Sequence, residues 1–528
     1  MANRTISLRG SEYPLILPSI RDPRLHVAGV ILSVHALGQL GLHFQVSVPQ
    51  ILAAILTCAV LEVSITFVQH RAFIWPASAM LTGSGVALIL RVVGTRADDP
   101  WSTYAWYVFA GVAGLSLLTK YVIRYQGANL FNPSNVGLVV AFVLLGSGRV
   151  EPLDFWWAPL NVWMIAAYLV ILVGGSLITR RLHLLALAAS FWLALSAGVG
   201  ILAGSGHCIT ANWAFAPVCG ADYWRVVIAS PEVLIFLFFM ITDPKVVPAG
   251  RVARVVFGVL TAVACTLLMA PQTDEFGTKV GLLAGLVVLC IGRPVLDRLM
   301  PEPRSAADTL TAFAARLVTG GAGAGLVRGA VRVGLVVVAV SVVGVGVVFA
   351  GTPARGLVVA DSSEALNQVP HQINPATLPP ITVGQSVWDW DHEIAGSAPD
   401  LLVTLAQNLE VENRALLRSD AGLLAVVDHG DRLKEMQARL QRDAATGTTV
   451  IDLYAFDSVH VTLLVPFGVQ TGLSLGFDSR GTVTEETYDS TGRLVSRQST
   501  SFANTFAIRR ATGARWLNVA VLPLGSGT

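Results

Sequence analysis

Several ionisable and amide side chains of this chain fall inside long apolar runs, where such groups cost free energy and therefore mark candidate binding or transport sites. Glu62 interrupts the run AVLEVSITF, and Glu232 lies near the start of a later run. Asn132, Ser134 and Asn135 surround a proline in QGANLFNPSNVG, which indicates the start of a broken helix. These residues predict a ligand or ion site. The alternative is interhelical hydrogen bonding that only holds a helix bundle together.

The elements that must position these side chains are membrane spans. Only 13% of the 528 residues are charged, whereas soluble proteins carry about 25%. Apolar runs of about 20 residues recur, long enough to cross a hydrocarbon layer. The lipid bilayer is therefore one partner, and the net charge of +2 gives no indication of nucleic-acid binding. We predict a polytopic α-helical membrane protein with spans at 26–44, 47–69, 76–95, 102–119, 134–147, 159–178, 183–204, 225–242, 253–270, 278–297 and 333–350.

The distribution of Lys and Arg predicts the direction of these spans, because cytoplasmic segments are enriched in both. With the N-terminus inside, most of these cations fall on the cytoplasmic side, including Lys245, Arg251 and Arg254 in one hairpin. We therefore expect a multi-pass bacterial plasma-membrane protein whose C-terminal part is extracytoplasmic. Cys208 and Cys219 share the longest outer loop, where a disulfide would persist.

Two pairs of segments suggest an internal repeat. VGLVVAFVLLG from Val136 matches VGLLAGLVVLCIG from Val280, and Pro76 and Pro231 lie near the starts of the third and eighth spans. Five spans per copy is an odd number, so the second copy would be inverted in the membrane. Inverted repeats often place a binding site between the halves, where the N-termini of interrupted helices attract anions.

Three segments together resemble the RnfD/NqrB family of large membrane subunits. They are PASAMLTGSGVALIL, QGANLFNPSNVG and FFMITDPKVVPAGRVARVVFG, followed by RPVLDRLMPEPR. The resemblance covers roughly residues 20–304. It implies ten spans in two inverted five-helix halves, flavin binding, and electron transfer coupled to ion movement. Asp243, in the TDP hairpin, would pin the end of span eight beside the cofactor cavity.

The chain departs from the family where FMN is attached covalently. Glu151 precedes Pro152 and Leu153 at the place of the flavin-bearing Thr, and the second motif, SGAT, reads ASPE from Ala229 to Glu232. A phosphoester-linked flavin needs a hydroxyl side chain, so we do not expect covalent FMN. Noncovalent riboflavin or FMN stays compatible with the sequence. RnfD-like proteins encoded with enediyne pathways, the UnbU type, lack the same motif and look most similar.

The remaining chain predicts a second domain. We divide the sequence into a cytoplasmic N-terminal segment (1–25), a ten-helix membrane domain (26–298), a cytoplasmic linker (299–332), an eleventh, tethering span (333–350), a second linker (351–397) and an extracytoplasmic α+β domain (398–528). In that last domain a helical pattern precedes strand-like runs, and 478–481 and 489–492 have the composition of hairpin turns. One interpretation is a cone-shaped antiparallel sheet that holds a ligand or an extracytoplasmic protein partner.

Three functions fit these observations. The first is an electron-transfer-associated subunit that serves specialised, enediyne-type metabolism. The second is a small-molecule permease built on the same inverted-repeat fold, and the third is a membrane scaffold that recruits a biosynthetic enzyme. The sequence has no zinc-type, phosphate-loop or dinucleotide-binding motif, so we expect no metal site and no NADH site in this chain.

Overall fold

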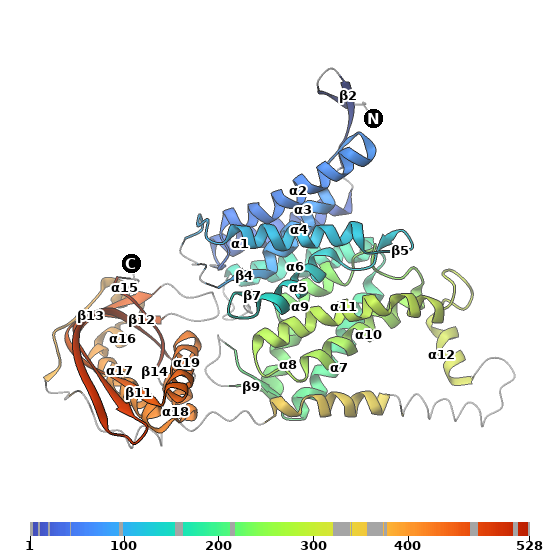
Figure 1. Ribbon diagram of the computed structural model, residues 1–528. Helices are drawn as coiled ribbons and strands as arrows, with labels where there is room; N and C mark the ends of the chain where they lie inside the picture. The colour runs from blue at the N-terminus through green and yellow to red at the C-terminus, as the bar shows by residue number, and fades with distance from the viewer. Residues whose placement is uncertain are drawn as a thin grey trace. The chain divides into compact units, whose positions relative to one another are not determined.

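The computed structural model describes residues 4–8, 11–19, 22–42, 44–93, 95, 99–153, 162–211, 217–319, 338, 340–355, 373, 377–464, 474–510 and 516–525. The chain forms two compact units, and the division falls near residue 357. The first unit is a bundle of helices, and the second combines helices with a long-stranded sheet (Figure 1). The structure therefore supports a membrane-associated protein with a separate, sheet-rich C-terminal region.

The first unit is built from apolar helices joined by short strands. Its helices are α1 (Pro23–Leu40), α2 (Val48–His70), α3 (Ala77–Ile89), α4 (Trp106–Val122), α5 (Pro133–Leu145), α6 (Val162–Arg181), α7 (Leu185–Gly204), α8 (Gly220–Ala229), α9 (Pro231–Ile235), the π-helical turn η1 (Phe236–Met240), α10 (Arg251–Met269), α11 (Glu275–Leu299) and α12 (Leu310–Thr319). Its strands are β1 (Arg4–Leu8), β2 (Ser11–Ile16), β3 (Phe73–Ile74), β4 (Leu90–Val92), β5 (Arg124–Tyr125), β6 (Ala128–Asn129), β7 (Val150–Pro152), β8 (Cys208–Ile209) and β9 (Val218–Cys219).

Six segments among the described residues are long and apolar enough to cross a membrane. They are Val48–His70, Val162–Arg181, Leu185–Gly204, Gly220–Met240, Arg251–Met269 and Glu275–Leu299. Shorter apolar helices lie at Ala77–Ile89, Trp106–Val122, Pro133–Leu145 and Val340–Ala350. The predicted spans 76–95 and 134–147 thus contain only the 13-residue helices α3 and α5, about 20 Å long. The strands β4 and β7 follow α3 and α5 in the chain. They pair with each other and so connect the C-terminal ends of these two helices.

The packing of the helices follows one scheme twice. In the first set α1 packs on α3, α2 packs on α3 and α4, and α4 packs on α5. In the second set α6 packs on α9 and η1, α7 packs on α8 and α10, and α10 packs on α11. The contacts α1–α6 and α5–α11 join the sets.

Two glycines from the matched sequence segments occupy similar places in this scheme. Gly137 of α5 lies against α4, and a Cβ atom there would stand 2.9 Å from the Cα atom of Ser116. Gly281 of α11 lies against α10, and a Cβ atom there would stand 2.8 Å from the carbonyl oxygen of Leu268. Each glycine therefore allows its helix to approach the backbone of the preceding helix closely.

The predicted span 225–242 is a broken helix. Its first part, α8, ends at Ala229, and the Ser230 hydroxyl then caps α9 by accepting the N–H of Val233 at 3.2 Å. Pro231 begins α9, which suits the first turn of a helix because proline has no N–H to donate. Immediately before α8, Cys208 and Cys219 form the predicted disulfide, between β8 and β9.

The polar N-terminal segment contains two strands. β1 and β2 form an antiparallel hairpin, and β2 pairs with β3, which lies in the connection between α2 and α3. Tyr13 of this hairpin contacts Phe67 and Phe73, with ring centroids 5.1 and 6.2 Å apart. The N-terminal hairpin and the α2–α3 connection therefore lie on the same side of the bundle.

The second unit is an α+β fold. Its elements are β10 (Ile381–Val383), α15 (Gln385–Trp390), α16 (His392–Gly396), α17 (Ala398–Arg418), α18 (Ala421–Val427), α19 (Gly430–Thr446), β11 (Thr448–Leu464), β12 (Ser474–Asp489), β13 (Leu494–Arg510) and β14 (Trp516–Pro523). The strands are ordered β10-β11-β12-β13-β14, with β10 parallel to β11 and the other neighbours antiparallel.

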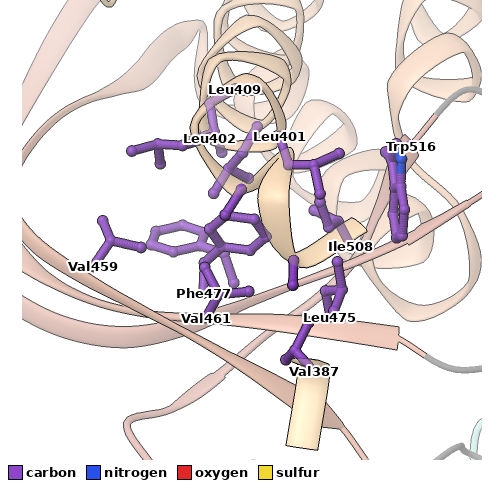
Figure 2. Packing of buried hydrophobic residues seen from close by; sticks show 14 of the residues in the cluster. Val387, Leu401, Leu402, Leu409, Val459, Val461, Leu475, Phe477, Ile508 and Trp516 are labelled. Carbon is purple, nitrogen blue, oxygen red and sulfur yellow. The ribbon is translucent and has the colours of Figure 1, made fainter. Parts of the chain in front are cut away.

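Side chains fill the interior between α17 and the sheet. Leu402 of α17, Phe477 of β12 and Ile508 of β13 are fully buried there, and Figure 2 shows them converging. Tyr454 and Phe502 meet edge to face, with ring centroids 5.2 Å apart. Long strands are possible here because one face of the sheet is covered by this core along much of its length.

The expected turn at 478–481 is wrong, because these residues lie inside β12. Gly481 has no turn conformation. A Cβ atom at this position would lie 1.9 Å from the carbonyl oxygen of Ala455, on β11. A glycine inside a strand often marks such close backbone contact. The second expected turn is confirmed: Gly492 has φ of 78°, and Asp489 accepts the backbone N–H groups of Thr491 and Arg493.

Candidate functional site

Two of the segments that carry the family resemblance meet in the structure. The Asn132 side chain, at the start of α5, donates to the carbonyl oxygen of Met240, at the end of η1, over 3.3 Å. These residues are 108 positions apart in the sequence. The amide therefore joins the FNP segment to the TDP hairpin directly.

A cavity of about 420 Å³ lies at this junction. Its apolar lining comes mainly from α1, α3, α6, α9 and η1, and its polar lining comes from the starts of α1, α3 and α5 and from the TDP hairpin. The polar lining residues are Asp22, Arg24, Ser78, Thr82, Asn129, Asn132, Ser134, Thr242, Asp243 and Lys245. The apolar ones include Val27, Ile31, Leu81, Phe238 and Phe239.

The asparagine cluster organises the N-terminus of α5 at the cavity wall. Asn132 is the N-cap, and its side-chain oxygen accepts the N–H of Asn135 at 3.2 Å and the hydroxyl of Ser134 at 2.9 Å. Asn135 donates over 3.0 Å to the carbonyl oxygen of Leu283 in α11. Asn132 and Ser134 thus line the cavity, whereas Asn135 binds the second set of helices.

Asp243 organises the TDP hairpin, which lines part of the cavity. Its carboxylate accepts the N–H of Lys245 at 3.0 Å, and its carbonyl oxygen accepts the N–H groups of Val246 and Val247. The helix η1 has already ended at Met240, so these bonds shape the turn that follows it. The role of Asp243 beside a cofactor stays a prediction.

Further charges stand at the cavity wall beside α1. The Arg24 guanidinium donates to both carboxylate oxygens of Asp22, over distances between 2.6 and 3.1 Å. Asp22 also caps α1 by accepting the N–H of Arg24 at 2.9 Å. The hydrogen bonds from Arg24 are the largest effect on the Asp22 carboxyl and hold its pKa below the usual range. The wall of the cavity near α1 therefore carries a compensated ion pair.

Glu62 belongs to a separate ion-pair network next to this cavity. The Lys120 ammonium, from α4, donates to both oxygens of Glu62 at 2.6 and 2.9 Å, and the Tyr121 hydroxyl donates to the second oxygen at 2.5 Å. Lys120 also lies 3.5 Å from the hydroxyl of Ser78, which lines the cavity. Glu62 is therefore paired with a cation that contacts the cavity lining, but Glu62 itself does not line the cavity.

Glu232 lies in a different place. It lines a small void of about 30 Å³, enough for about one water molecule. The Lys279 ammonium lies 3.6 Å from Glu232 and 2.6 Å from Glu275, and donates to the carbonyl oxygen of Leu153 at 2.5 Å. Two carboxylates and one ammonium are therefore held together in a largely apolar setting.

Glu151, at the place of the family's flavin-bearing Thr, is buried and paired with a cation. It faces Arg91 across the β4–β7 pair, and the Arg91 guanidinium lies 3.4 Å from its carboxylate. The neighbouring Pro152 and Leu153 line the small void beside Glu232. This arrangement gives Glu151 a structural partner within the strand pair.

Sequence reasoning missed the cationic partners of the two carboxylates. Lys120 lies just after the predicted span 102–119 and Lys279 at the start of the span 278–297, and both belong to helices in the structure. The spacing of four residues between Glu275 and Lys279 could have indicated their pairing on one helix face. No comparable signal links Glu62 to Lys120, because the two residues are far apart in sequence.

The chain matches no protein-family model, and no curated protein matches it.

Proposed function

We propose that the first unit is an RnfD/NqrB-like membrane subunit that holds a noncovalent flavin, riboflavin or FMN, and takes part in electron transfer. The observation that carries the proposal is that the FNP and TDP segments, which are distant in sequence, line one cavity of about 420 Å³. Cavities between about 300 and 1,000 Å³ are typical of sites for small organic ligands and cofactors.

The residues present fit a flavin. An isoalloxazine ring has apolar faces and one edge that donates and accepts hydrogen bonds. Phe238, Phe239 and Ile31 supply apolar walls, and Thr82 and Thr242 supply hydroxyl groups among the lining residues. The bound group would supply the capacity for electron transfer. The chain's own residues would orient the ring and exclude water from it.

The absence of a covalent link is part of the proposal. Residue 151 is a glutamate that pairs with Arg91, so it offers no hydroxyl for a phosphoester. Ser230, in the region of the second family motif, is fully buried and caps α9 with its hydroxyl. A flavin held only by contacts in the cavity would leave the protein on denaturation.

The architecture that we propose consists of ten spans in two inverted five-helix repeats. The repeated packing scheme and the matched glycines Gly137 and Gly281 support this proposal. An eleventh span would follow at 333–350, of which the structure describes only residue 338 and Val340–Ala350. With the N-terminus in the cytoplasm, the α+β unit would be extracytoplasmic and available to a protein partner. The disulfide of Cys208 and Cys219 would then lie on the oxidising side of the membrane.

The cellular setting remains the one that the resemblance implies. We place the protein in the bacterial plasma membrane and in specialised, enediyne-type metabolism rather than respiration. The missing attachment residue supports this placement, because the UnbU-type relatives also lack it.

The test is the visible absorption spectrum of the protein purified in detergent. We expect flavin absorption, and release of all the flavin when the protein is denatured in acid. Val27→Trp would fill the cavity from α1 and should remove the flavin. Leu32→Trp, on the same helix, is the matched control, because Leu32 is 53% exposed and does not line the cavity.

The outcomes separate the candidate functions. A colourless protein refutes flavin binding. If liposomes with the colourless protein then take up a small solute, and Val27→Trp blocks the uptake, the permease is the better function. If neither colour nor flux is found, the scaffold function is favoured. A flavin that stays bound after acid denaturation would contradict the noncovalent part of the proposal.

A further inference from the structure

The strand β13 has a long edge that pairs with no described strand. On one side it pairs with β12 along nearly its whole length, from Leu494 to Ile508. On the other side β14 pairs only with Asn504–Arg510. The pairing ends at Pro523, the last residue of β14, which cannot donate a further ladder hydrogen bond. Within the part of the chain that the structure describes, residues 494–503 therefore have no strand on this side, over about 33 Å of strand.

This open edge has little protection against pairing. Proteins usually block an edge strand with charges, proline, a bulge or a covering loop. The segment LVSRQSTSFA has no proline, and Leu494 and Val495 are 45% and 60% exposed. Its one charged side chain, Arg497, turns toward β12, where its guanidinium lies 2.9 Å from Glu486. The only register shift in the β12–β13 pairing lies at Thr487, at the hairpin end.

We infer that this edge pairs with the same edge of a second copy of the chain, so that two sheets join into one continuous sheet. The sequence of the edge is compatible with a two-fold axis at Gln498. Antiparallel pairing about this axis sets Leu494 against Phe502 of the second copy and Ser496 against Thr500. It sets Arg497 against Ser499, so no like charges face each other.

The second copy is the occupant that the observations favour over an unrelated peptide. A copy brings an edge of equal length, and one contact closes both open edges at once, as in most two-fold dimers. Serine and threonine side chains facing one another across strands can form hydrogen bonds, as Ser499 and Thr484 already do within the chain at 2.9 Å. If the partner were an unrelated peptide, the purified chain alone would not form this pairing.

Cysteine cross-linking in native membranes tests the inference on the full chain. In Gln498→Cys the two thiols would face each other at the axis, and we expect a covalent dimer under mild oxidation. Glu485→Cys is the matched control. Glu485 lies on β12, directly opposite Gln498 in the sheet, and is also exposed. Its two copies would be separated by three strand spacings, about 14 Å, and should not cross-link.

Charge substitutions test the register independently of folding. Adding Ser496→Lys and Thr500→Lys to the cysteine variant would set lysine against lysine twice. The cross-linking rate should then fall about tenfold, because like charges directly opposite each other destabilise a sheet. Adding Ser496→Lys and Thr500→Glu would set opposite charges together and should keep the rate unchanged or raise it. The inference is overturned if Gln498→Cys gives no dimer, if Glu485→Cys cross-links equally, or if both charge pairs act alike.

Discussion

One buried pair of carboxyl groups in the C-terminal unit makes a sharp prediction about pH. Glu412 of α17 accepts two hydrogen bonds from the buried Arg432, at 3.1 and 2.5 Å, and one from Asn518 at 2.7 Å. Asp428 follows α18 and is only 1% exposed. Burial and the neighbouring Glu412 carboxylate raise the pKa of Asp428 well above its ordinary value of 3.8. Burial opposes the ionisation of Glu412, but Arg432 and the hydrogen bonds lower its pKa overall.

The two shifts act on stability in opposite pH ranges. The raised pKa of Asp428 contributes stability below pH 3.8 that is lost as the pH rises toward its pKa in the folded protein. The lowered pKa of Glu412 contributes stability above its ordinary value of 4.5 that is lost as the pH falls. Above the ordinary pKa of glutamate, the shift of Asp428 is therefore the one that changes stability, and it lowers the free energy of unfolding as the pH rises. One linked proton changes the free energy of unfolding by about 1.4 kcal/mol per pH unit.

Asp428→Asn removes the carboxyl group that binds this proton and keeps the shape of the side chain. We expect the variant to be more stable than the wild type at pH 7 by about 1–3 kcal/mol, with a flatter pH dependence. Glu412→Gln is the contrasting variant. It removes the buried carboxylate partner of Arg432 and leaves the guanidinium only the exposed Glu435, at 3.0 Å, so it should cost up to about 3–5 kcal/mol.

The assay is urea-dependent pulse proteolysis of the full chain in detergent, read at the C-terminal unit, at several values between about pH 5 and 8. If Asp428→Asn is less stable than the wild type at pH 7, or keeps the same pH slope, the reasoning about the carboxyl pair is refuted.

Three further predictions concern the first unit. Gly137→Leu should clash with α4 and destabilise the unit by about 1–3 kcal/mol or more, whereas Gly111→Leu, which meets nothing within 4 Å, should leave the thermal midpoint unchanged. Asp308→Ala removes the acceptor for the first N–H groups of α10 and should lower stability by about 0.5–2 kcal/mol, measured by thermal unfolding in detergent. An unchanged midpoint would contradict that capping role. Cys208→Ser breaks a disulfide that spans a sequence separation of 11 and should cost about 2–4 kcal/mol, seen as faster cleavage between positions 208 and 219 by added protease.

The sequence was sufficient to locate the motifs of the cavity but not its boundaries. Asn132, Ser134 and Asp243 were predicted as site residues, and all three line one cavity. Glu62 and Glu232 were predicted to join them, but the structure places the two carboxylates in separate ion-pair groups. Hydrophobicity locates a residue within a span, but it does not give the depth or the face that the residue occupies once the helices pack.

The secondary structure shows a similar division. Long apolar runs predicted most helices within a few residues, because burial of such runs in a bilayer is strongly favoured. The short length of α3 was not predicted, because the apolar run continues past the end of the helix into the strand β4. The glycine at 481 was read as a turn because glycine is also the residue that permits close backbone contact. Single-sequence patterns do not separate these two uses.

The partition between the two internal spaces of the bundle is thin. Leu88, Ile89 and Ile235 line both the large cavity and the small void that contains Glu232. We expect substitution of these three aliphatic side chains by alanine to join the two spaces. The bulk of the three side chains therefore keeps a pair of buried carboxylates and their shared lysine apart from the contents of the large cavity.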